Sequence, residues 1–200
     1  VGERTEVRVK ADHKDEVRGY DTDAAEAQVS HRLDEHWTLS GGARLDRKST
    51  DALNTSPLLP TVGVVEGERT DAVVKVDYAS TEGWSLYGFA QKTLKATGTR
   101  LDNDRLGVGA SYQVNDRLGL KGEVSGGDGG TGGRAGVDYR LDDRTNLYMT
   151  YVRDTGRTDE TLAARGGVLV GGVKSRVADG LNVYSEQRQT TGAQAGLGSA

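Results

Sequence analysis

The feature that most constrains the fold of this chain is a short pattern that recurs along it. An apolar residue is followed by two or three polar residues with turn propensity, and then by polar and apolar residues in alternation. Successive side chains of a β-strand point to opposite faces, so this alternation predicts strands with one apolar and one polar face. Asp, Asn, Glu and Gly at the centre of each copy suit tight hairpin turns. The copies are RLDEHWTL (32–39), ASTEGWSL (79–86), QVNDRLGL (113–120), RLDDRTNL (140–147) and RVADGLNV (176–183), and VGERTEV opens the chain.

Longer and more variable connections alternate with these tight turns. Because consecutive antiparallel strands reverse direction, this places the tight turns on one edge of a sheet and the longer loops on the other. The spacing predicts about twelve strands of about 8 to 13 residues in an antiparallel meander, forming a single domain over residues 1–200. We expect the glycine run GGDGGTGG to be a flexible external loop. The longer connections are residues 12–23, 48–68, 95–103, 126–133, 154–160 and 189–192.

Composition alone leans toward disorder, with 34% hydrophobic residues and a mean hydropathy of −0.60. The alternation argues against disorder, because it gathers the few apolar residues on one face of each strand. In the strand containing Val108, for example, Val108 is expected on the apolar face and Gly107 on the polar face. An arginine is therefore expected to be tolerated better at position 107 than at position 108. Both a membrane barrel and a soluble sandwich could produce this pattern.

The position of the aromatic residues separates these two folds. All five prominent ones lie on the apolar face within a few residues of a tight turn, whereas Lys92 and Arg165, charges in the apolar register, lie near the longer loops. A membrane barrel places amphipathic rings at the headgroup level and tolerates charges only away from the bilayer centre. This favours an up-and-down transmembrane β-barrel, and a soluble β-rich adhesion module is the alternative. The expected interface aromatics are Trp37, Tyr78, Trp84, Tyr112 and Tyr139.

The charge balance and the cysteine content limit the functional classes. The chain has 26 basic and 30 acidic residues, a net charge of −4, and therefore lacks the basic field of a nucleic-acid binder. The absence of cysteine removes disulfide and thiolate chemistry. The first residues show no signal peptide, and no apolar run approaches the about 20 residues of a membrane helix.

Three segments carry a resemblance to a known class of proteins. SYQVNDRLGLKGEV (111–124), DYRLDDRTNLYMTYV (138–152) and HRLDEHWTLSGGARLD (31–46) resemble the hairpins of Gram-negative outer-membrane β-barrels. The resemblance implies location in the outer membrane, with tight turns toward the periplasm and loops outside. The chain differs in lacking a signal sequence and in ending at GLGSA without a terminal aromatic. Similar hairpins occur in the barrel regions of large bacterial surface proteins, so the chain is also compatible with a piece of a longer barrel.

No catalytic, metal or cofactor site is predicted. Some outer-membrane barrels are hydrolases with a Ser–His pair, but none of His13, His31 and His36 is placed for general-base work with a serine, and no two of them share a face at metal-ligand spacing. The glycine run lacks both the Lys-Ser/Thr and the following helix of a phosphate-binding loop. Its single Asp is too little for a calcium-binding repeat.

The charged face of the strands is the best candidate for function. In a barrel this face lines the lumen, where mixed charges form either the wall of an aqueous pore or a salt-bridge network that fills it. We expect a passive channel for small hydrophilic solutes, with the lipid bilayer as the main partner and the oligomeric state open. The alternative is a membrane anchor or surface scaffold with a plugged lumen. The predicted lumen residues are Arg44, Asp71, Lys75, Arg105, Lys121, Glu123, Arg134, Asp138, Arg140 and Glu186.

Overall fold

The computed structural model describes residues 4–16, 20–50, 66–153, 167–178 and 181–191, and within them it contains eleven β-strands. Arg165 lies outside the described residues. No helix long and apolar enough to cross a membrane occurs in these segments. The strands are β1 (Thr5–Glu16), β2 (Tyr20–Arg32), β3 (Trp37–Thr50), β4 (Gly67–Ala79), β5 (Trp84–Ala96), β6 (Arg105–Gln113), β7 (Leu118–Gly127), β8 (Gly130–Arg140), β9 (Thr145–Arg153), β10 (Gly167–Ala178) and β11 (Leu181–Thr191).

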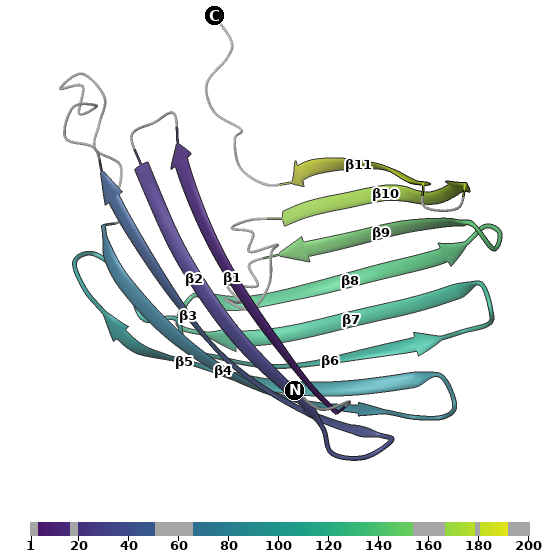
Figure 1. The fold of residues 1–200 in the computed structure, drawn as a ribbon, viewed down its shortest axis with the longest axis horizontal. Helices are drawn as coiled ribbons and strands as arrows, with labels where there is room; N and C mark the ends of the chain where they lie inside the picture. Colours follow the sequence, from purple (N-terminus) through teal and green to yellow (C-terminus); the bar gives the residue numbers. More distant parts are fainter. Residues whose placement is uncertain (1–3, 17–19, 51–65, 154–166, 179–180, 192–200) are drawn as a thin grey trace, which may run out of the picture.

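All eleven strands form one sheet in sequence order, and every neighbouring pair is antiparallel. The sheet is strongly curved, and its edge strands β1 and β11 are not paired with each other in the described residues (Figure 1). The connections β2–β3, β4–β5, β6–β7 and β8–β9 lie on one rim, together with the paired ends of β10 and β11 at Ala178 and Leu181, and the connections β5–β6 and β7–β8 lie on the opposite rim (Figure 1). The predicted antiparallel meander is confirmed, with eleven described strands where the spacing predicted about twelve.

The tight turns share one stabilising device, which explains why their sequences repeat. Asp34, Asn115 and Asp142 each occupy the second position of a turn, and their Oδ1 atoms accept hydrogen bonds from the backbone N–H groups two and three residues later, at 2.8 to 2.9 Å. Short polar side chains of this kind close a turn by imitating a backbone acceptor. In the β4–β5 turn Ser80 Oγ accepts one such bond, from the N–H of Glu82 at 3.0 Å, and Gly83 there has a φ of 80°.

These backbone donors also favour the charged form of the turn carboxylates. The N–H groups of His36 and then Trp37 lower the pKa of Asp34, and the N–H of Arg144 lowers the pKa of Asp142. A carboxyl group with a lowered pKa in the folded state stabilises the fold above its unfolded pKa. That contribution is lost as the pH falls below about 3.9 and through the folded pKa.

We expect Asp142→Asn to keep the turn at neutral pH, because Asn115 makes the same two hydrogen bonds in the β6–β7 turn. Asp142→Ala removes the acceptor and should lower the denaturant midpoint at pH 7. Between pH 7 and pH 3 the midpoint of Asp142→Asn should fall less than that of the wild type, because the titrating group is gone. Asp143→Asn is the control, because it also removes one carboxylate charge from the turn but leaves the hydrogen bonds to Asp142 in place. An equal change in the pH dependence of the midpoint for both variants would contradict a role for the Asp142 hydrogen bonds.

The glycine run 126–133 is not the flexible external loop that the sequence suggested. β7 and β8 continue through it and are joined by Asp128 and Gly129 alone. Glycine is needed here for close packing, since a Cβ at Gly127 would lie 1.9 Å from the carbonyl oxygen of Asp104. The backbone N–H of Asp128 donates to the same oxygen at 3.0 Å. The run therefore lets the β7–β8 turn pack against the β5–β6 connection.

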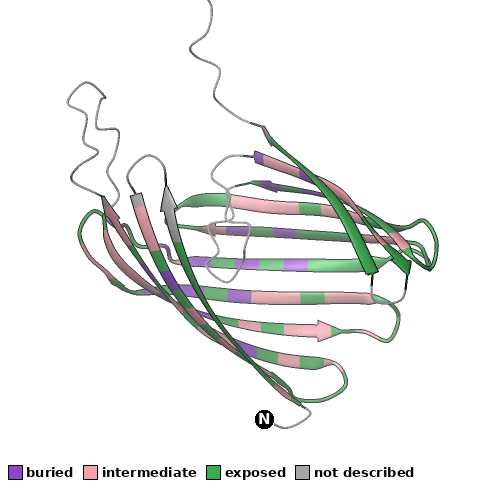
Figure 2. Ribbon diagram, turned by 45° about the horizontal axis from the view of Figure 1, so that its top comes forward, coloured by how far each residue is buried: buried purple, intermediate pink, exposed green. Residues whose placement is uncertain are grey.

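The strand register divides the sheet into a convex apolar face and a concave polar face. One row of partners, Gly41, Val74 and Ala90, lies on the convex face, and the adjacent row, Gly42, Val73 and Gln91, lies on the concave face. The central strands carry many of the buried residues (Figure 2), and the register places those of β4 to β7 on the concave side, whereas large apolar side chains on the convex side stay exposed. This is opposite to a soluble sandwich, in which the apolar face would form the core.

Candidate functional site

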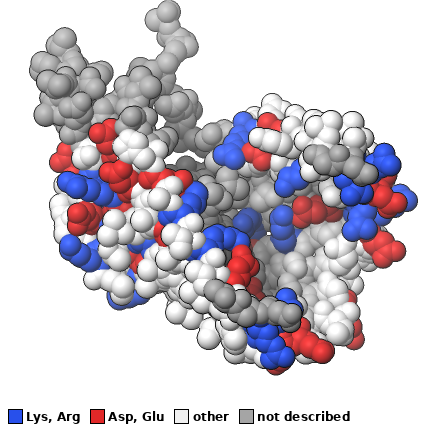
Figure 3. All heavy atoms as spheres, viewed as in Figure 1, with Lys and Arg blue, Asp and Glu red and all other residues white. Residues whose placement is uncertain are grey.

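The concave face carries charges of both signs along most of its width. Viewed into the hollow of the sheet, Lys and Arg lie beside Asp and Glu (Figure 3). All ten predicted lumen residues fall within described strands, and the register places Arg44 opposite Asp71, Lys121 next to Glu123 along β7, and Glu123 opposite Arg134. The face divides into a buried part near the loop rim and a more exposed part toward the tight turns.

The buried part is centred on Asp71, whose side chain has no exposed surface. Its carboxylate accepts hydrogen bonds from Arg69 Nε at 2.9 Å and from Thr93 Oγ1 at 2.7 Å. On the neighbouring strand β3, Asp46 forms an ion pair with Arg100 and lies 3.9 Å from Arg69. Two carboxylates and two guanidinium groups therefore neutralise each other on the concave face, because buried charges need partners of the opposite sign.

A second buried group lies over β5 to β8. Glu123 accepts hydrogen bonds from Tyr87 Oη and from Arg134 Nη2, the latter at 3.0 Å. Arg105 lies on the concave face but is almost fully buried, and it donates to Ser125 Oγ at 2.9 Å and to the Gly130 carbonyl at 3.2 Å. Through these contacts Arg105 stabilises the fold. A substitution of Arg105 would therefore disturb the structure as well as remove a charge from the concave face.

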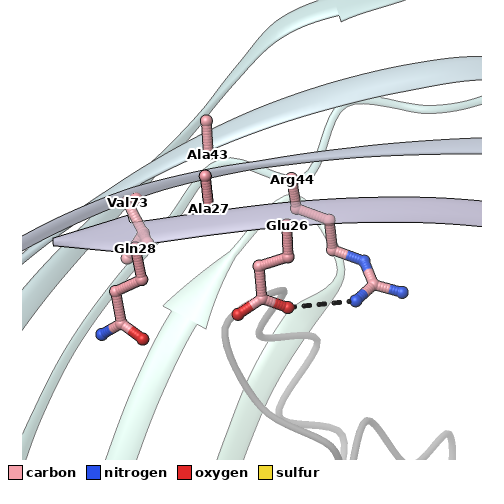
Figure 4. Close-up of a pocket in the computed structure, with 7 residues that line it drawn as sticks. Glu26, Ala27, Gln28, Ala43, Arg44 and Val73 are labelled. Atoms are coloured by element: carbon pink, nitrogen blue, oxygen red, sulfur yellow. Dashed lines mark hydrogen bonds and ion pairs between the residues drawn. The ribbon is translucent and has the colours of Figure 1, made fainter. Parts of the chain in front are cut away.

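Toward the tight turns the charged pairs keep contact with water. Lys121 Nζ lies 2.8 Å from Asp138, and their side chains are 41% and 53% exposed. Lys75 lies 2.7 Å from Asp77 and 4.5 Å from the centre of the Tyr87 ring. Arg44 pairs with Glu26 at 3.3 Å, and both point to the concave side while Ala27 and Ala43 point away (Figure 4). The exposure of the charged pairs therefore increases from Arg44–Glu26 at mid-strand to Lys121–Asp138 near the tight turns.

Two predicted lumen residues lie apart from these groups. Glu186, on the edge strand β11, accepts hydrogen bonds from Tyr148 Oη at 2.6 Å and from Arg188 Nε at 2.7 Å. Arg140 is the last residue of β8, where it is exposed at the tight-turn rim.

Two aromatic side chains on the concave face, Tyr87 and Phe89, were not predicted from the sequence. Tyr87 and Phe89 lie there because Leu86, Gly88 and Ala90 occupy the alternate positions, and they fit over two glycines of β6. A Cβ at Gly107 would lie 2.5 Å from the Phe89 ring, and one at Gly109 would lie 2.2 Å from the Tyr87 ring. The glycine–aromatic complementarity of β5 and β6 was the available signal. Nothing in the alternation marks Arg100 or the buried role of Asp46.

The predicted interface aromatics lie on the convex face at the tight-turn ends of their strands. Tyr78 contacts Trp37 and Trp84, with ring centroids 5.0 and 5.2 Å apart, and Tyr112 is the register partner of Trp84. Tyr139 lies further along the same rim, opposite Leu118. The rings therefore form a continuous cluster over β3 to β6 with a separate member on β8.

The convex face changes from aromatic to aliphatic to charged between the rims. On β3 the outward residues run from Trp37 to Leu45, and Arg47 follows, opposite Asp23 of β2. Lys92, at the loop end of β5, pairs with Asp104. Eight residue steps of a tilted strand span about 20 Å across a bilayer, close to the apolar band of about 25 Å in membrane barrels. β11 differs, because its outward positions include Ser185, Gln187 and Gln189.

The histidines are engaged in local contacts. His13 Nδ1 lies 2.6 Å from Asp23, His31 Nδ1 lies 2.8 Å from Thr5 Oγ1, and His36 Nδ1 lies 2.8 Å from the Ala79 carbonyl. Within the described segments, no three His, Asp or Glu side chains are grouped to hold a metal ion.

Comparison with known proteins agrees with this geometry. A model of the YadA-like membrane anchor domain matches residues 96–141, from the end of β5 to just past β8. A triple mutant of the Rhodopseudomonas blastica porin superposes with a TM-score of 0.52 at 16% sequence identity, covering 84% of this chain and 50% of the porin chain. The chain thus spans about half the length of that porin chain. Another variant of the same porin gives a TM-score of 0.46 at 12% identity, covering 93% of this chain and 85% of that chain. No curated protein sequence matches the chain.

The antiparallel meander, the apolar convex face and the porin-like superposition define the class of protein. The chain has the all-β fold of an outer-membrane β-barrel protein. The match to the anchor domain covers less than a quarter of the 200 residues, and it contains one of the three segments from which the sequence resemblance was drawn, residues 111–124.

Proposed function

We propose that this chain forms the wall of a barrel in the bacterial outer membrane, with a concave face that lines an aqueous passage for small hydrophilic solutes. The observation that carries the proposal is the exposed Lys121–Asp138 pair on the face opposite the apolar surface. Ionised side chains remain half exposed only where water reaches them. Water on the concave side and an apolar convex side together are what a solute passage through a membrane requires.

A test is available because Lys121 and Asp138 have opposite charges and similar exposure. Fixed charges near a pore bias which ions enter. We expect Lys121→Ala to shift the reversal potential of the refolded protein in planar bilayers toward cation selectivity, and Asp138→Asn to shift it toward anion selectivity. Folding should change little, since exposed ion pairs contribute about 0–1 kcal/mol. Shifts of the same sign in both variants would contradict a lining role for this pair.

A membrane anchor with a filled interior is the second candidate. The match of residues 96–141 to a membrane anchor domain and the buried ion pairs over β3 to β8 favour it. In both candidates the barrel itself has no catalytic role. Wild-type protein that is folded in lipid but gives no measurable conductance would refute the passage and support the anchor.

A further inference from the structure

The connection between β5 and β6, residues 97–104, turns over the concave face. Its first half extends the sheet at the loop rim, because the N–H groups of Thr97 and Thr99 donate to the carbonyls of Glu68 and Glu66, both at 2.9 Å. At Gly98 the φ angle is +65°, which reverses the chain. After this reversal the segment runs back toward the interior of the sheet.

Arg100 anchors this segment to a strand that is not adjacent to it. Its guanidinium pairs with Asp46 on β3, so the side chain extends past β4 on the concave side. The Arg100 and Asp46 side chains are only 5% and 9% exposed. Leu101, the next residue, is 80% exposed, so the loop presents Arg100 inward and Leu101 to its surroundings.

The end of the connection is held by the concave side chains of β5. The backbone N–H of Asn103 donates to Thr93 Oγ1 at 2.8 Å, and the Asn103 carbonyl accepts from Gln91 Nε2 at 2.7 Å. Thr93 also donates to Asp71, which joins the loop to the buried ion pairs. These bonds fix the segment against the concave wall.

The link between Arg100 and Asp46 is incomplete, which makes it suited to opening. Asp46 Oδ1 and Arg100 Nε are both buried and neither takes part in a hydrogen bond. Buried polar atoms without a hydrogen bond reduce the net stability that an ion pair provides, and Arg69 Nε, 3.9 Å from Asp46 Oδ1, is too distant to supply one. The contact that holds the loop across β4 is thus a single ion pair, Arg100–Asp46, in which two buried polar atoms make no hydrogen bond.

We infer that the Arg100–Asp46 pair is a latch that holds the β5–β6 loop inside the passage and limits its conductance. This inference rests on the proposed function for its effect on solutes, but the latch itself is a property of the fold. Arg100 and Asp46 are positioning residues, since they set where the loop lies. Release of the pair frees residues 100–102 to move away from the concave face, while Asn103 keeps its bonds to Thr93 and Gln91, and widens the passage.

Two measurements on the full chain test the latch, and one does not depend on transport. In the wild type, trypsin should cut slowly after Arg100, because the side chain is buried against Asp46. In Asp46→Asn, with the charge removed and the shape kept, we expect cleavage after Arg100 to be at least tenfold faster. Asp138→Asn is the matched control and should leave this cleavage rate unchanged. Wild-type cleavage kinetics in folded Asp46→Asn would overturn the latch.

The second measurement is single-channel conductance in a planar bilayer. We expect Asp46→Asn to conduct at least about twice as much as the wild type, because the loop no longer narrows the passage. The chain has no cysteine, so a short bismaleimide across Asp46→Cys and Arg100→Cys should restore the lower conductance. If Asp46→Asn does not fold, Asp46→Asn with Arg100→Gln removes both buried charges and replaces it. Faster cleavage with unchanged conductance would place the latch outside the passage and overturn the inference, whereas a silent wild type would refute the proposed function.

Discussion

Replacing Asp71 with alanine should lower the free energy of unfolding by about 3 kcal/mol, because it leaves the partly buried Arg69 guanidinium without its closest carboxylate. Breaking a buried pair by removing one partner is costly, since the remaining charge has lost both its partner and its water. Thr93 Oγ1 would lose its acceptor at the same time. Urea titration of the refolded protein measures the change directly.

Asp138→Ala is the matched control for this prediction. It also removes a carboxylate from the concave face and breaks an ion pair, but that pair is half exposed. We expect a change of about 0–1 kcal/mol. Equal destabilisation by the two substitutions would show that the β3–β5 charges are not buried as described.

Arginine at position 108 should oppose membrane insertion by about 2–4 kcal/mol. Val108 is 58% exposed on the convex face and lies between Gly88 and Val124, in the middle of the apolar band. A charge there must either enter hydrocarbon or distort the bilayer. Refolding into lipid vesicles under a denaturant titration measures the cost.

The control for Val108→Arg has to be chosen from the structure. Alternation alone suggests Gly107→Arg as the control. A side chain at position 107 would clash, however, because the Phe89 ring and Ser125 already fill the space on the concave side of Gly107. Ser111 is a better control, because it is exposed on the concave face of the same strand, where its hydroxyl forms a hydrogen bond with that of Ser85. Ser111→Arg should insert nearly as well as the wild type. An equal penalty at 108 and 111 would mean that the strand does not separate lipid from water.

The sequence predicted the architecture because period-two alternation and turn chemistry are local. Asp34, Asn115 and Asp142 determine their turns within four residues, and each turn then sets the register of its hairpin. The faces of the charged residues followed from the same alternation. What alternation could not show was which inward charges are buried, because burial depends on strands distant in sequence. Asp46 and Arg100 are 54 residues apart, and their contact depends on a loop conformation with no local pattern.

The glycine run shows the same limitation in another form. Glycine in a polar stretch is typical of flexible loops, but here it allows two backbones to approach closely. The partner of Gly127 is the backbone at Asp104, which belongs to another connection. Only the packing of the β5–β6 loop against the β7–β8 turn distinguishes these two roles.

The unpaired edges of the sheet restrict the number of strands that a closed barrel containing it can have. In a meander whose neighbours are all antiparallel, odd-numbered strands run the same way, so β1 and β11 point in the same direction. Joined directly, they would form a parallel ladder in an otherwise antiparallel wall. Strand edges in hydrocarbon must be paired, because each unsatisfied backbone group there is costly. A fully antiparallel cylinder containing these eleven strands therefore has an odd number of further strands between β11 and β1, which makes its total even.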